Sequence, residues 1–444
     1  MIAKVDNVWS LEGFVTQNNA QAGINAGFIG LGQGGGKIVD ALASIKNPKN
    51  DQQVYPCIAI NSNLGDMKNL KNIASRFKYP LVGYEKGVGK DPQTGRQAFL
   101  ENGERIFDAI AEVMNQVDVI FVVASMGGGT GTGSINELTD AISRYLGKPV
   151  IAITTLPRPN EVESLNAYNA MAELVPKLGE IETDDNGRSY RLLESLIILD
   201  NEKIVNDHIQ DPEVQGITWD YYSNYKVASI LHEWSVLTSL ESDYTVDAAD
   251  LYNHILLAGG VITFAKKKID LDQFKNKDDL IAEIISTYRG KNVLANGFDY
   301  ENDMRSMALV VVMPRERESE LNQDTLEIIR TEIKKELPHI NFYPGSATSG
   351  SKRHAIVYTM ANMAGLPERA KNLRQEAEQL QREREARERQ ASGFNMGDKL
   401  ESQNRIGGKR GPVGSNPFSK QVAASSEEST ARPANNPFKN PFKK

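Results

Sequence analysis

A glycine-rich segment, GGGTGTGS, occupies residues 127–134 and constrains the fold of this chain more than any other sequence feature. It follows an apolar run typical of a buried strand, VIFVVAS, and leads directly into INELTDAISRYL, a segment of helical length. Five glycines leave backbone N–H groups accessible where the dipole of the following helix favours negative charge, and hydroxyl groups add donors. Close packing of a strand on a helix needs only one or two glycines, so the pattern predicts a loop that holds a di- or triphosphate. The candidate phosphate-binding residues are Gly127, Gly128, Gly129, Thr130, Gly131, Thr132 and Gly133.

A second glycine-rich segment, GLGQGGGK at residues 30–37, also stands between a strand-like run and a helical segment. Glycines let the backbone approach an anion closely, so phosphate binding is again the natural inference. The spacing also fits the dinucleotide-binding fingerprint, but the second strand ends on Asn61, Ser62 and Asn63 without the expected acidic residue. The segment matches a P-loop only in part, because Ile38 follows Gly36 and Lys37 where a P-loop has the Ser or Thr whose hydroxyl group binds Mg²⁺. The candidates here are Gly32, Gln33, Gly34, Gly35, Gly36 and Lys37.

Strand-like and helix-like segments alternate from about residue 24 to residue 200. Continuous apolar runs suit strands that helices cover on both faces, so this half predicts a parallel α/β sheet. Apolar residues spaced three and four apart predict one long helix over 221–241 that links two domains. The predicted strands are residues 24–31, 54–61, 117–125, 148–155 and 192–200, followed in a smaller α+β part by 261–267, 307–314 and 355–363. Helices are predicted in that part near 247–258, 278–290 and 323–336.

The composition, 40% hydrophobic and 25% charged, is that of a soluble globular protein. A single cysteine, Cys57, permits no internal disulfide and favours a reducing cytoplasm. No apolar stretch approaches the ~20 residues of a membrane span, so no membrane partner is expected. The five histidines form no ligand-spaced cluster, so no metal site built from protein side chains is predicted.

The C-terminal region differs in composition from the rest of the chain. Residues 367–392 carry seven Lys and Arg against six Glu among strong helix formers, which predicts a solvated helix. Residues 393–444 contain nine Lys and Arg against four Asp and Glu, a net charge of +5, and no periodicity, which predicts a disordered basic tail. The tripeptide NPF occurs in it three times, at 416–418, 436–438 and 440–442, either as a binding motif or by low-complexity drift.

Together these motifs resemble the tubulin/FtsZ superfamily, which has GGGTGTGS as its signature loop and a first phosphate loop similar to GLGQGGGK. The resemblance covers roughly residues 24–260, and LPRPNE, GYEKGVGKDPQTGR and NYKVASILHE look most like its TubZ branch, the partition tubulins of bacterial plasmids and phages. It implies GTP and GDP as ligands and Mg²⁺ as cofactor. It adds as binding candidates Asn61 and Asn63 for a phosphate loop, Gly87, Val88 and Gly89 near the γ-phosphate, Glu161 for the ribose, and Asn201 and Asn224 for the guanine edge.

The fold that this resemblance implies is α/β and tubulin/FtsZ-like. It combines a Rossmann-like parallel-sheet GTP-binding domain, a long central helix, a smaller α+β domain, an extended C-terminal helix and a disordered tail. The predicted boundaries are 1–23 for an N-terminal extension, 24–220 for the GTP-binding domain, 221–243 for the central helix, 244–366 for the second (activation) domain, 367–392 for the C-terminal helix and 393–444 for the tail.

Two carboxylates in DYTVDAADLYNHI, Asp247 and Asp250, are the catalytic candidates that the resemblance implies. In this family such residues act on the nucleotide of the adjacent subunit, so contact between subunits switches GTP hydrolysis on, and head-to-tail association gives filaments. They polarise the attacking water, while the glycine loops and Mg²⁺ neutralise the developing charge. The alternative interpretation of the pair is an ordinary helix start with favourable acidic residues in its first turn. Thr245 and Leu165 depart from the FtsZ pattern, which bears on the rate of hydrolysis more than on binding.

The resemblance thus implies a polymerisation-activated GTPase that segregates plasmid or phage DNA in a bacterial cytoplasm. One alternative is an FtsZ-like cell-division GTPase, whose apolar and acidic C-terminal peptide contrasts with the ending NPFKNPFKK found here. A dinucleotide-dependent oxidoreductase explains the first glycine-rich segment but not the second, and a nucleotide-gated scaffold without useful hydrolysis is a third reading. The expected partners are further copies of the chain and a DNA-bound adaptor protein held by the tail, with direct DNA contact as the weaker alternative.

Overall fold

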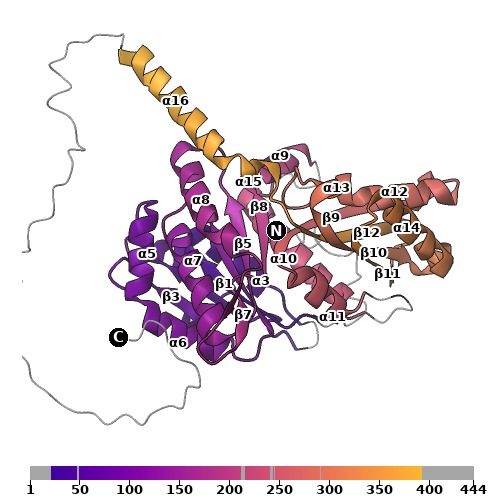
Figure 1. Cartoon of the computed structure of the whole chain (residues 1–444), viewed down its shortest axis with the longest axis horizontal. Helices are drawn as coiled ribbons and strands as arrows, with labels where there is room; N and C mark the ends of the chain where they lie inside the picture. The colour runs from indigo at the N-terminus through magenta and orange to yellow at the C-terminus, as the bar shows by residue number, and fades with distance from the viewer. Residues whose placement is uncertain are drawn as a thin grey trace, which may run out of the picture.

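Ten strands form one sheet in this protein, in the order β11-β10-β12-β9-β8-β5-β4-β1-β2-β3, with helices on both faces (Figure 1). The structure, a computed structural model, describes residues 22–47, 50–211, 216–240, 244, 246–290 and 292–392. Outside these described residues lie the predicted tail with its NPF repeats, nearly all of the predicted N-terminal extension, Thr245 and the last three residues of the predicted central helix.

The first half of the chain forms the parallel part of the sheet, as predicted. Strand β1 pairs in parallel with β2 and β4, β4 pairs with β5, and β5 pairs with β8. Along β4, Ile120 and Val122 enter one hydrophobic core while Phe121 and Val123 enter the other, on the opposite face. The continuous apolar runs therefore correspond to strands buried on both faces. The strands of this half are β1 (Ala26–Leu31), β2 (Cys57–Asn61), β3 (Lys78–Pro80), β4 (Val119–Ser125), β5 (Val150–Leu156) and β8 (Ser195–Asp200), with a separate hairpin of β6 (Ile181–Thr183) and β7 (Ser189–Arg191).

The helices between these strands begin at side chains suited to cap them. Asn63, Asp91, Asn160 and Asp200 each accept a hydrogen bond from a backbone N–H in the first turn of the helix that follows. The helices of this half are α3 (Gly32–Ala43), α4 (Leu64–Lys68), α5 (Pro92–Glu101), α6 (Gly103–Val113), α7 (Thr130–Ala141), α8 (Glu161–Leu174) and α9 (Asn201–Gln210). A π-helical turn (Ile142–Leu146) extends α7, and short 3₁₀ turns lie at Ser75–Phe77 and Val175–Lys177.

The second half of the chain continues the same sheet. Strand β9 pairs in parallel with β8 over three residue pairs that begin at Ser195 and Gly260, and antiparallel with β12. The predicted boundary between the two domains therefore falls within one hydrogen-bonded sheet. The domain boundaries given above remain predictions. The elements of this half are β9 (Gly260–Asp270), β10 (Met304–Pro314), β11 (Asn341–Ser349), β12 (His354–Met363), α11 (Ala248–Leu251) with a π-helical turn (Tyr252–Leu256), α12 (Lys277–Gly290), α13 (Tyr300–Asp303) and α14 (Gln323–Glu336), with 3₁₀ turns at Leu271–Gln273 and Arg315–Leu321.

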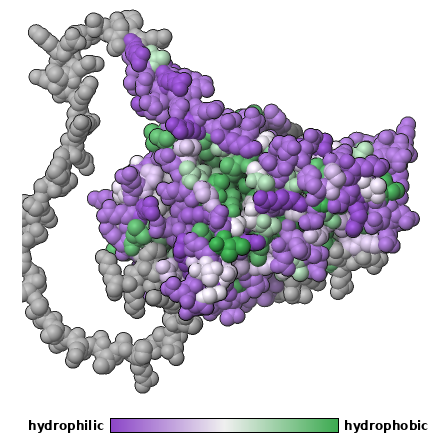
Figure 2. Space-filling view, viewed as in Figure 1, coloured by the Kyte–Doolittle hydropathy of each residue, from purple (hydrophilic) through white to green (hydrophobic). Residues whose placement is uncertain are grey.

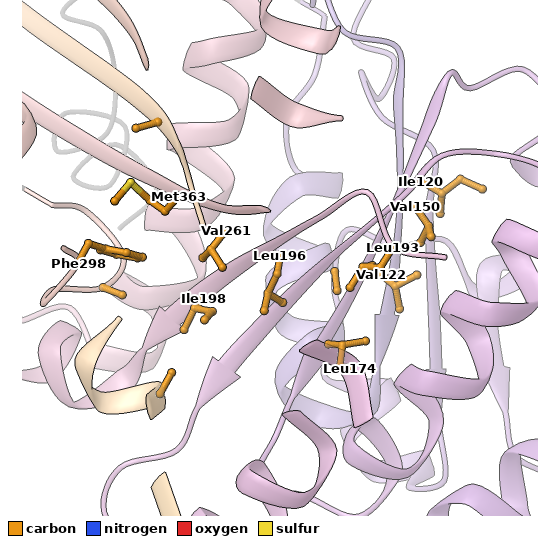
Figure 3. Close-up of a cluster of buried hydrophobic side chains, with 14 of the residues drawn as sticks. Ile120, Val122, Val150, Leu174, Leu193, Leu196, Ile198, Val261, Phe298 and Met363 are labelled. Atoms are coloured by element: carbon orange, nitrogen blue, oxygen red, sulfur yellow. The ribbon is translucent and has the colours of Figure 1, made fainter. Parts of the chain in front are cut away.

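The long helix α10 (Trp219–Leu237) joins the two halves. It ends at Leu237 and a turn at Thr238 and Ser239 follows, whereas the sequence pattern predicted a helix to residue 241. Trp234 is buried and its ring meets Tyr358 of β12 edge-on, with centroids 6.3 Å apart. Figure 3 shows the core on the other face of the sheet, where residues of β4 and β5 continue through β8 to β9 and β12. On the surface shown in Figure 2, hydrophobic residues gather near the centre of the view.

The C-terminal segment forms two helices where one was predicted. Helix α15 (Glu368–Lys371) and helix α16 (Leu373–Ser392) are separated at Asn372. The buried side chains of Ala370 and Leu373 hold the break against the body of the molecule, and α16 then projects beyond it (Figure 1). Among the described residues, no helix combines the length and apolarity needed to cross a bilayer.

Candidate nucleotide-binding site

A cavity of about 360 Å³ opens at the carboxyl ends of β1, β2 and β4. Ligands of parallel sheets bind at this edge, because the loops after the strands meet there. The cavity collects residues from five segments that are distant in the sequence. Of the predicted residues, Gly32, Gln33, Gly34, Asn61, Asn63, Gly87, Val88, Gly89, Gly127, Gly128, Gly129, Thr130 and Gly131 line it, whereas Gly35, Gly36, Lys37, Thr132, Gly133, Glu161, Asn201 and Asn224 do not.

The GGGTGTGS segment is part loop and part helix, because α7 begins at Thr130. Gly128 faces open space, and a Cβ atom placed there would meet nothing within 4 Å. Gly131 instead packs closely: a Cβ atom there would lie 3.0 Å from the carbonyl oxygen of Leu31. The Thr130 and Ser62 hydroxyl groups are 2.7 Å apart and buried. The glycines therefore serve two purposes, an open backbone toward the cavity and close contact between α7 and the sheet.

The first glycine-rich segment is largely helical, since α3 begins at Gly32. Gly32 has a φ of +68°, a conformation that glycine adopts without strain. Gly35 lies so close to β4 that a Cβ atom would collide with the carbonyl oxygen of Val123. Lys37 points away from the cavity lining, and its Nζ lies 3.1 Å from the carboxylate of Asp220 on α10. In this structure the lysine joins α3 to the long helix.

The segment after β3 closes one side of the cavity. Gly87 and Gly89 have φ values of +92° and +61°, so this turn depends on glycine. Lys90 follows with its Nζ 2.5 Å from the carboxylate of Glu163 on α8. The side-chain amide of Asn166, also on α8, donates to the carbonyl oxygen of Lys90 at 3.0 Å. These contacts hold the turn over the glycine loop.

Several residues of the cavity were not predicted from the sequence. Ser62, Asp66, Lys90, Ser125 and Glu163 line it together with Leu31. Ser62, Asp66, Lys90 and Ser125 lie within three residues of predicted site residues, so proximity in the sequence was a usable signal for them. Glu163 belongs to α8, and only the folded chain brings it to Lys90.

The residues predicted for the ribose and the guanine lie farther along the same edge. Glu161 begins α8 after β5, and Asn201 begins α9 after β8. Neighbouring strands are about 4.8 Å apart, so the end of β8 lies about 10 Å from the end of β4. Asn224 lies on α10, which packs against both α9 and α3. The carboxylate of Glu161 pairs with Arg384 of α16 at 3.0 Å.

The two acidic residues predicted for catalysis lie near the amino ends of the parallel strands, whereas the cavity lies at the carboxyl ends. The hydroxyl group of Tyr252 donates to the carbonyl oxygen of Asp118 at 2.9 Å, and Asp118 stands immediately before β4. From there β4 runs seven residues to the cavity, which is about 20 Å. In Figure 1 helix α11 lies at the lower side of the view, and α8 and α16 lie at the upper side.

The local contacts of these acids are those of a helix start. Asp247 caps α11, since its carboxylate accepts from the N–H of Ala249 at 2.9 Å. Asp250 is half exposed, 3.9 Å from Nε2 of His254. The ring of His254 stacks on Tyr343 of β11, with centroids 5.6 Å apart. Neither acid contacts the cavity of its own chain.

Comparison with known families defines the class of this protein. The family model described as "Tubulin/FtsZ family, GTPase domain" matches residues 25–207, and the one described as "Tubulin/FtsZ-like protein TubZ-like, C-terminal domain" matches residues 233–374. The chain belongs to the tubulin/FtsZ family and is a GTPase of that family. Within the family its second half is TubZ-like.

Individual relatives agree with this assignment. The tubulin-like protein TubZ of Bacillus cereus is 26% identical over 393 residues, which is 83% of this chain and 86% of the relative. The cell division protein FtsZ of Pseudomonas aeruginosa is 34% identical, but over only 40% of this chain and 39% of the relative. The GTPase match also sets the dinucleotide-dependent oxidoreductase aside.

Solved structures share the fold. A GTPγS-form protofilament of Bacillus thuringiensis serovar israelensis TubZ superposes with a TM-score of 0.71 at 23% identity, over 84% of this chain and 96% of that one. A helical model of a two-stranded TubZ filament gives 0.73 at 22% identity, over 88% and 96%. The predicted tubulin/FtsZ-like fold is thereby confirmed.

Proposed function

We propose that this GTPase polymerises head to tail and hydrolyses GTP between neighbouring subunits. The observation that carries the proposal is the distance of about 20 Å along β4 between the cavity and the edge that holds Asp247 and Asp250. One chain does not bring the acids to its own cavity, but a second copy stacked along the strand direction does. A stack of this kind does not close on itself, so it grows into a filament. The protofilament and filament forms of the solved TubZ structures support this arrangement.

Each group of residues has a proposed role. The backbone N–H groups of the two glycine-rich segments hold the phosphates, with Gly87, Val88 and Gly89 beside the terminal one. Glu161 binds the ribose, and the side-chain amides of Asn201 and Asn224 read the guanine edge, because an amide offers both a donor and an acceptor. Asp247 and Asp250 of the adjacent subunit polarise the attacking water.

The cavity suits a magnesium ion bound together with the phosphates. Asp66 and Glu163 supply carboxylates, and Thr130 and Ser62 supply hydroxyl groups. Magnesium is typically held by one or two carboxylates plus phosphate oxygens and water. No group of three metal-binding side chains gathers anywhere in the described residues, so nucleotide oxygens complete the proposed coordination. When bound, the ion offsets the negative charge of the phosphates.

The proposed biological role is segregation of plasmid or phage DNA in the bacterial cytoplasm. The TubZ match over 83% of the chain supports it, since the FtsZ match is confined to 40%. The basic tail, residues 393–444 with net charge +5, is proposed to bind a DNA-bound adaptor protein. Deletion of residues 393–444 tests this assignment: polymerisation should persist and adaptor binding should be lost. A truncated chain that binds the adaptor as well as the full chain rejects the assignment.

The decisive experiment follows light scattering and phosphate release together, with GTP, GDP or ATP and Mg²⁺, across protein concentrations. We expect scattering only with GTP and above a threshold concentration, with turnover rising at the same threshold. In Asp247→Ala, filaments should form and persist while hydrolysis per subunit falls. Asp324→Ala is the control, because Asp324 is likewise an exposed aspartate at the start of a helix, α14, and should behave as wild type. Undiminished turnover in Asp247→Ala filaments rejects the catalytic assignment.

A further inference from the structure

The C-terminal segment packs directly on the base and ribose side of the proposed site. Ala370, Leu373 and Ala377 are buried and anchor α15 and the start of α16. Helix α16 then runs along α8, the helix that begins with the proposed ribose residue Glu161. Side chains of α15 and α16 therefore reach the loops that follow β5 and β8.

Arg369 of α15 forms an enclosed set of contacts with three separate elements. Its side chain is 17% exposed. Nε and Nη2 donate to the two carboxylate oxygens of Glu376, on α16, at 3.0 and 3.1 Å. Nη2 also donates to the carbonyl oxygen of Pro157, just after β5, at 2.6 Å, and Nη1 donates to the carboxylate of Asp200 at the end of β8. One guanidinium group thus ties the C-terminal helices to two strand ends.

The acceptors around Arg369 are themselves held in place. Glu376 also accepts a hydrogen bond from the hydroxyl group of Ser164, on α8, at 2.6 Å, and Ser164 is fully buried. Asp200 also accepts the N–H of Glu202 at 3.0 Å. The network carries one cation and two carboxylates, each with more than one partner. Such a buried set favours a single geometry, because a displaced member leaves a desolvated charge unpaired.

Asp200 connects this network to the proposed recognition of guanine. It is the last residue of β8 and the cap of α9, and the residue that follows it, Asn201, is the proposed guanine-reading amide. The side chain of a cap residue accepts a backbone N–H of the first helical turn and so ties that turn to itself, as Asp200 does with the N–H of Glu202. A shift of the Asp200 carboxylate therefore turns the segment that presents Asn201.

We propose that Arg369 is a positioning residue for guanine selectivity. By holding Asp200 it fixes the first turn of α9, so that the amide of Asn201 meets the edge of the base in one orientation. The inference rests on the proposed function of the same site. The planar fork of arginine is needed for acceptors on three elements, which the point charge of a lysine does not satisfy at once.

The test is calorimetric titration of the full-length chain with GDP and with inosine diphosphate, which lacks the 2-amino group of guanine. We expect wild type to prefer GDP, and Arg369→Gln to lose about tenfold of that preference, the effect of about one hydrogen bond. Arg369→Lys should lose most of it too. A merely structural role of Arg369 predicts another result, equal weakening of both ligands or a lower melting temperature with the preference intact.

Arg387→Gln is the matched control, because Arg387 is a 79% exposed arginine of α16 with a loose partner, Glu383, at 3.6 Å. It should keep the wild-type preference. If Arg369→Gln does not fold, Glu376→Gln removes one charge of the network and should reduce the preference in the same direction. Wild type without any preference for GDP overturns the proposed reading of the guanine edge by Asn201 and Asn224, and this inference with it, whereas hydrolysis between subunits is tested separately by scattering and phosphate release. A wild-type preference that both Arg369→Gln and Glu376→Gln retain overturns this inference alone.

Discussion

Individual glycines of the two signature segments have separable roles. Gly128 faces the open cavity and Gly35 presses on the backbone of β4. The sequence motif gives both residues the same assignment, phosphate binding, because a glycine-rich string does not reveal which neighbours each glycine meets. The same limit explains why Glu163 was missed, since its contact with Lys90 crosses from α8 to a distant turn.

We predict that alanine at these two glycines affects different properties, stability at Gly35 and nucleotide binding at Gly128. Gly35→Ala should lower the free energy of unfolding by about 1–3 kcal/mol, because its methyl group overpacks the contact with β4. Gly128→Ala should leave that free energy within about 0.5 kcal/mol of wild type and weaken GDP binding, because its methyl group enters the cavity. Urea denaturation and nucleotide titration measure the two quantities. Equal losses of stability in both variants contradict the distinction.

We predict that a half-buried histidine, His232, makes the stability of this protein depend on pH. Burial lowers the pKa of His232 to about 4 from 6.5, and its Nδ1 lies 3.0 Å from the hydroxyl group of Tyr55. Between these pH values the unfolded chain binds a proton at His232 and the folded chain does not. The free energy of unfolding should therefore keep its full value above pH 6.5. Between pH 6.5 and pH 4 it should fall on acidification, by about 1.4 kcal/mol per pH unit from this group alone.

His232→Gln tests that dependence, because it keeps a polar group opposite Tyr55 and removes the titration. We expect the free energy of unfolding of the variant to change less with pH between 4 and 6.5 than that of wild type. Urea denaturation across this range measures the difference. Parallel pH profiles of the two proteins rule out His232 as the source.

At the scale of elements, the long helix α10 is joined to the second half of the sheet by a buried ion pair. Nζ of Lys266 on β9 lies 2.9 Å from the carboxylate of Glu233, whose side chain is 3% exposed. We predict that Lys266→Met lowers the free energy of unfolding by about 3–5 kcal/mol, because it leaves a buried carboxylate without its cation. Chemical denaturation gives the value.

Two further variants complete this test. The double variant Lys266→Met with Glu233→Leu should recover much of the loss, since it removes both charges. Lys335→Met should change stability by at most about 1 kcal/mol, because its ion pair with Glu332 is exposed. A double variant as unstable as the single one argues against the unpaired charge as the cause.

Strands with continuous apolar runs were predictable, and β11 was not. The run NFYPGSATS mixes polar and small residues and carries Pro344, and such a sequence is compatible with a strand only at the edge of a sheet, where β11 lies. The break at Asn372 was missed for a related reason. Helix propensity is high on both sides of it, and burial of Ala370 and Leu373 against the rest of the protein sets the break.

At the scale of the whole molecule, the separation of cavity and acids predicts complementation between two inactive chains. Asp247→Ala retains the cavity, and Gly128→Phe retains the acids while its ring fills the open space beside the glycine loop. Each alone should hydrolyse GTP slowly. A mixture should exceed the sum of the two rates, because intact cavities then meet intact acids across the contact. Phosphate release from the mixture equal to that sum contradicts hydrolysis between subunits.

Because the cavity and the two acids lie at opposite ends of the subunit's parallel strands, the two ends of a head-to-tail stack differ from each other. In the proposed arrangement, the last subunit at one end holds a nucleotide that no neighbouring subunit contacts, and the last subunit at the other end presents Asp247 and Asp250 without a neighbouring nucleotide. Freshly added GTP at the first of these ends therefore outlives GTP in the interior by as long as that subunit stays terminal. The nucleotide in the terminal subunit of such a polymer therefore depends on how recently that subunit was added: GTP marks an end that has just grown, and GDP marks an end that has not.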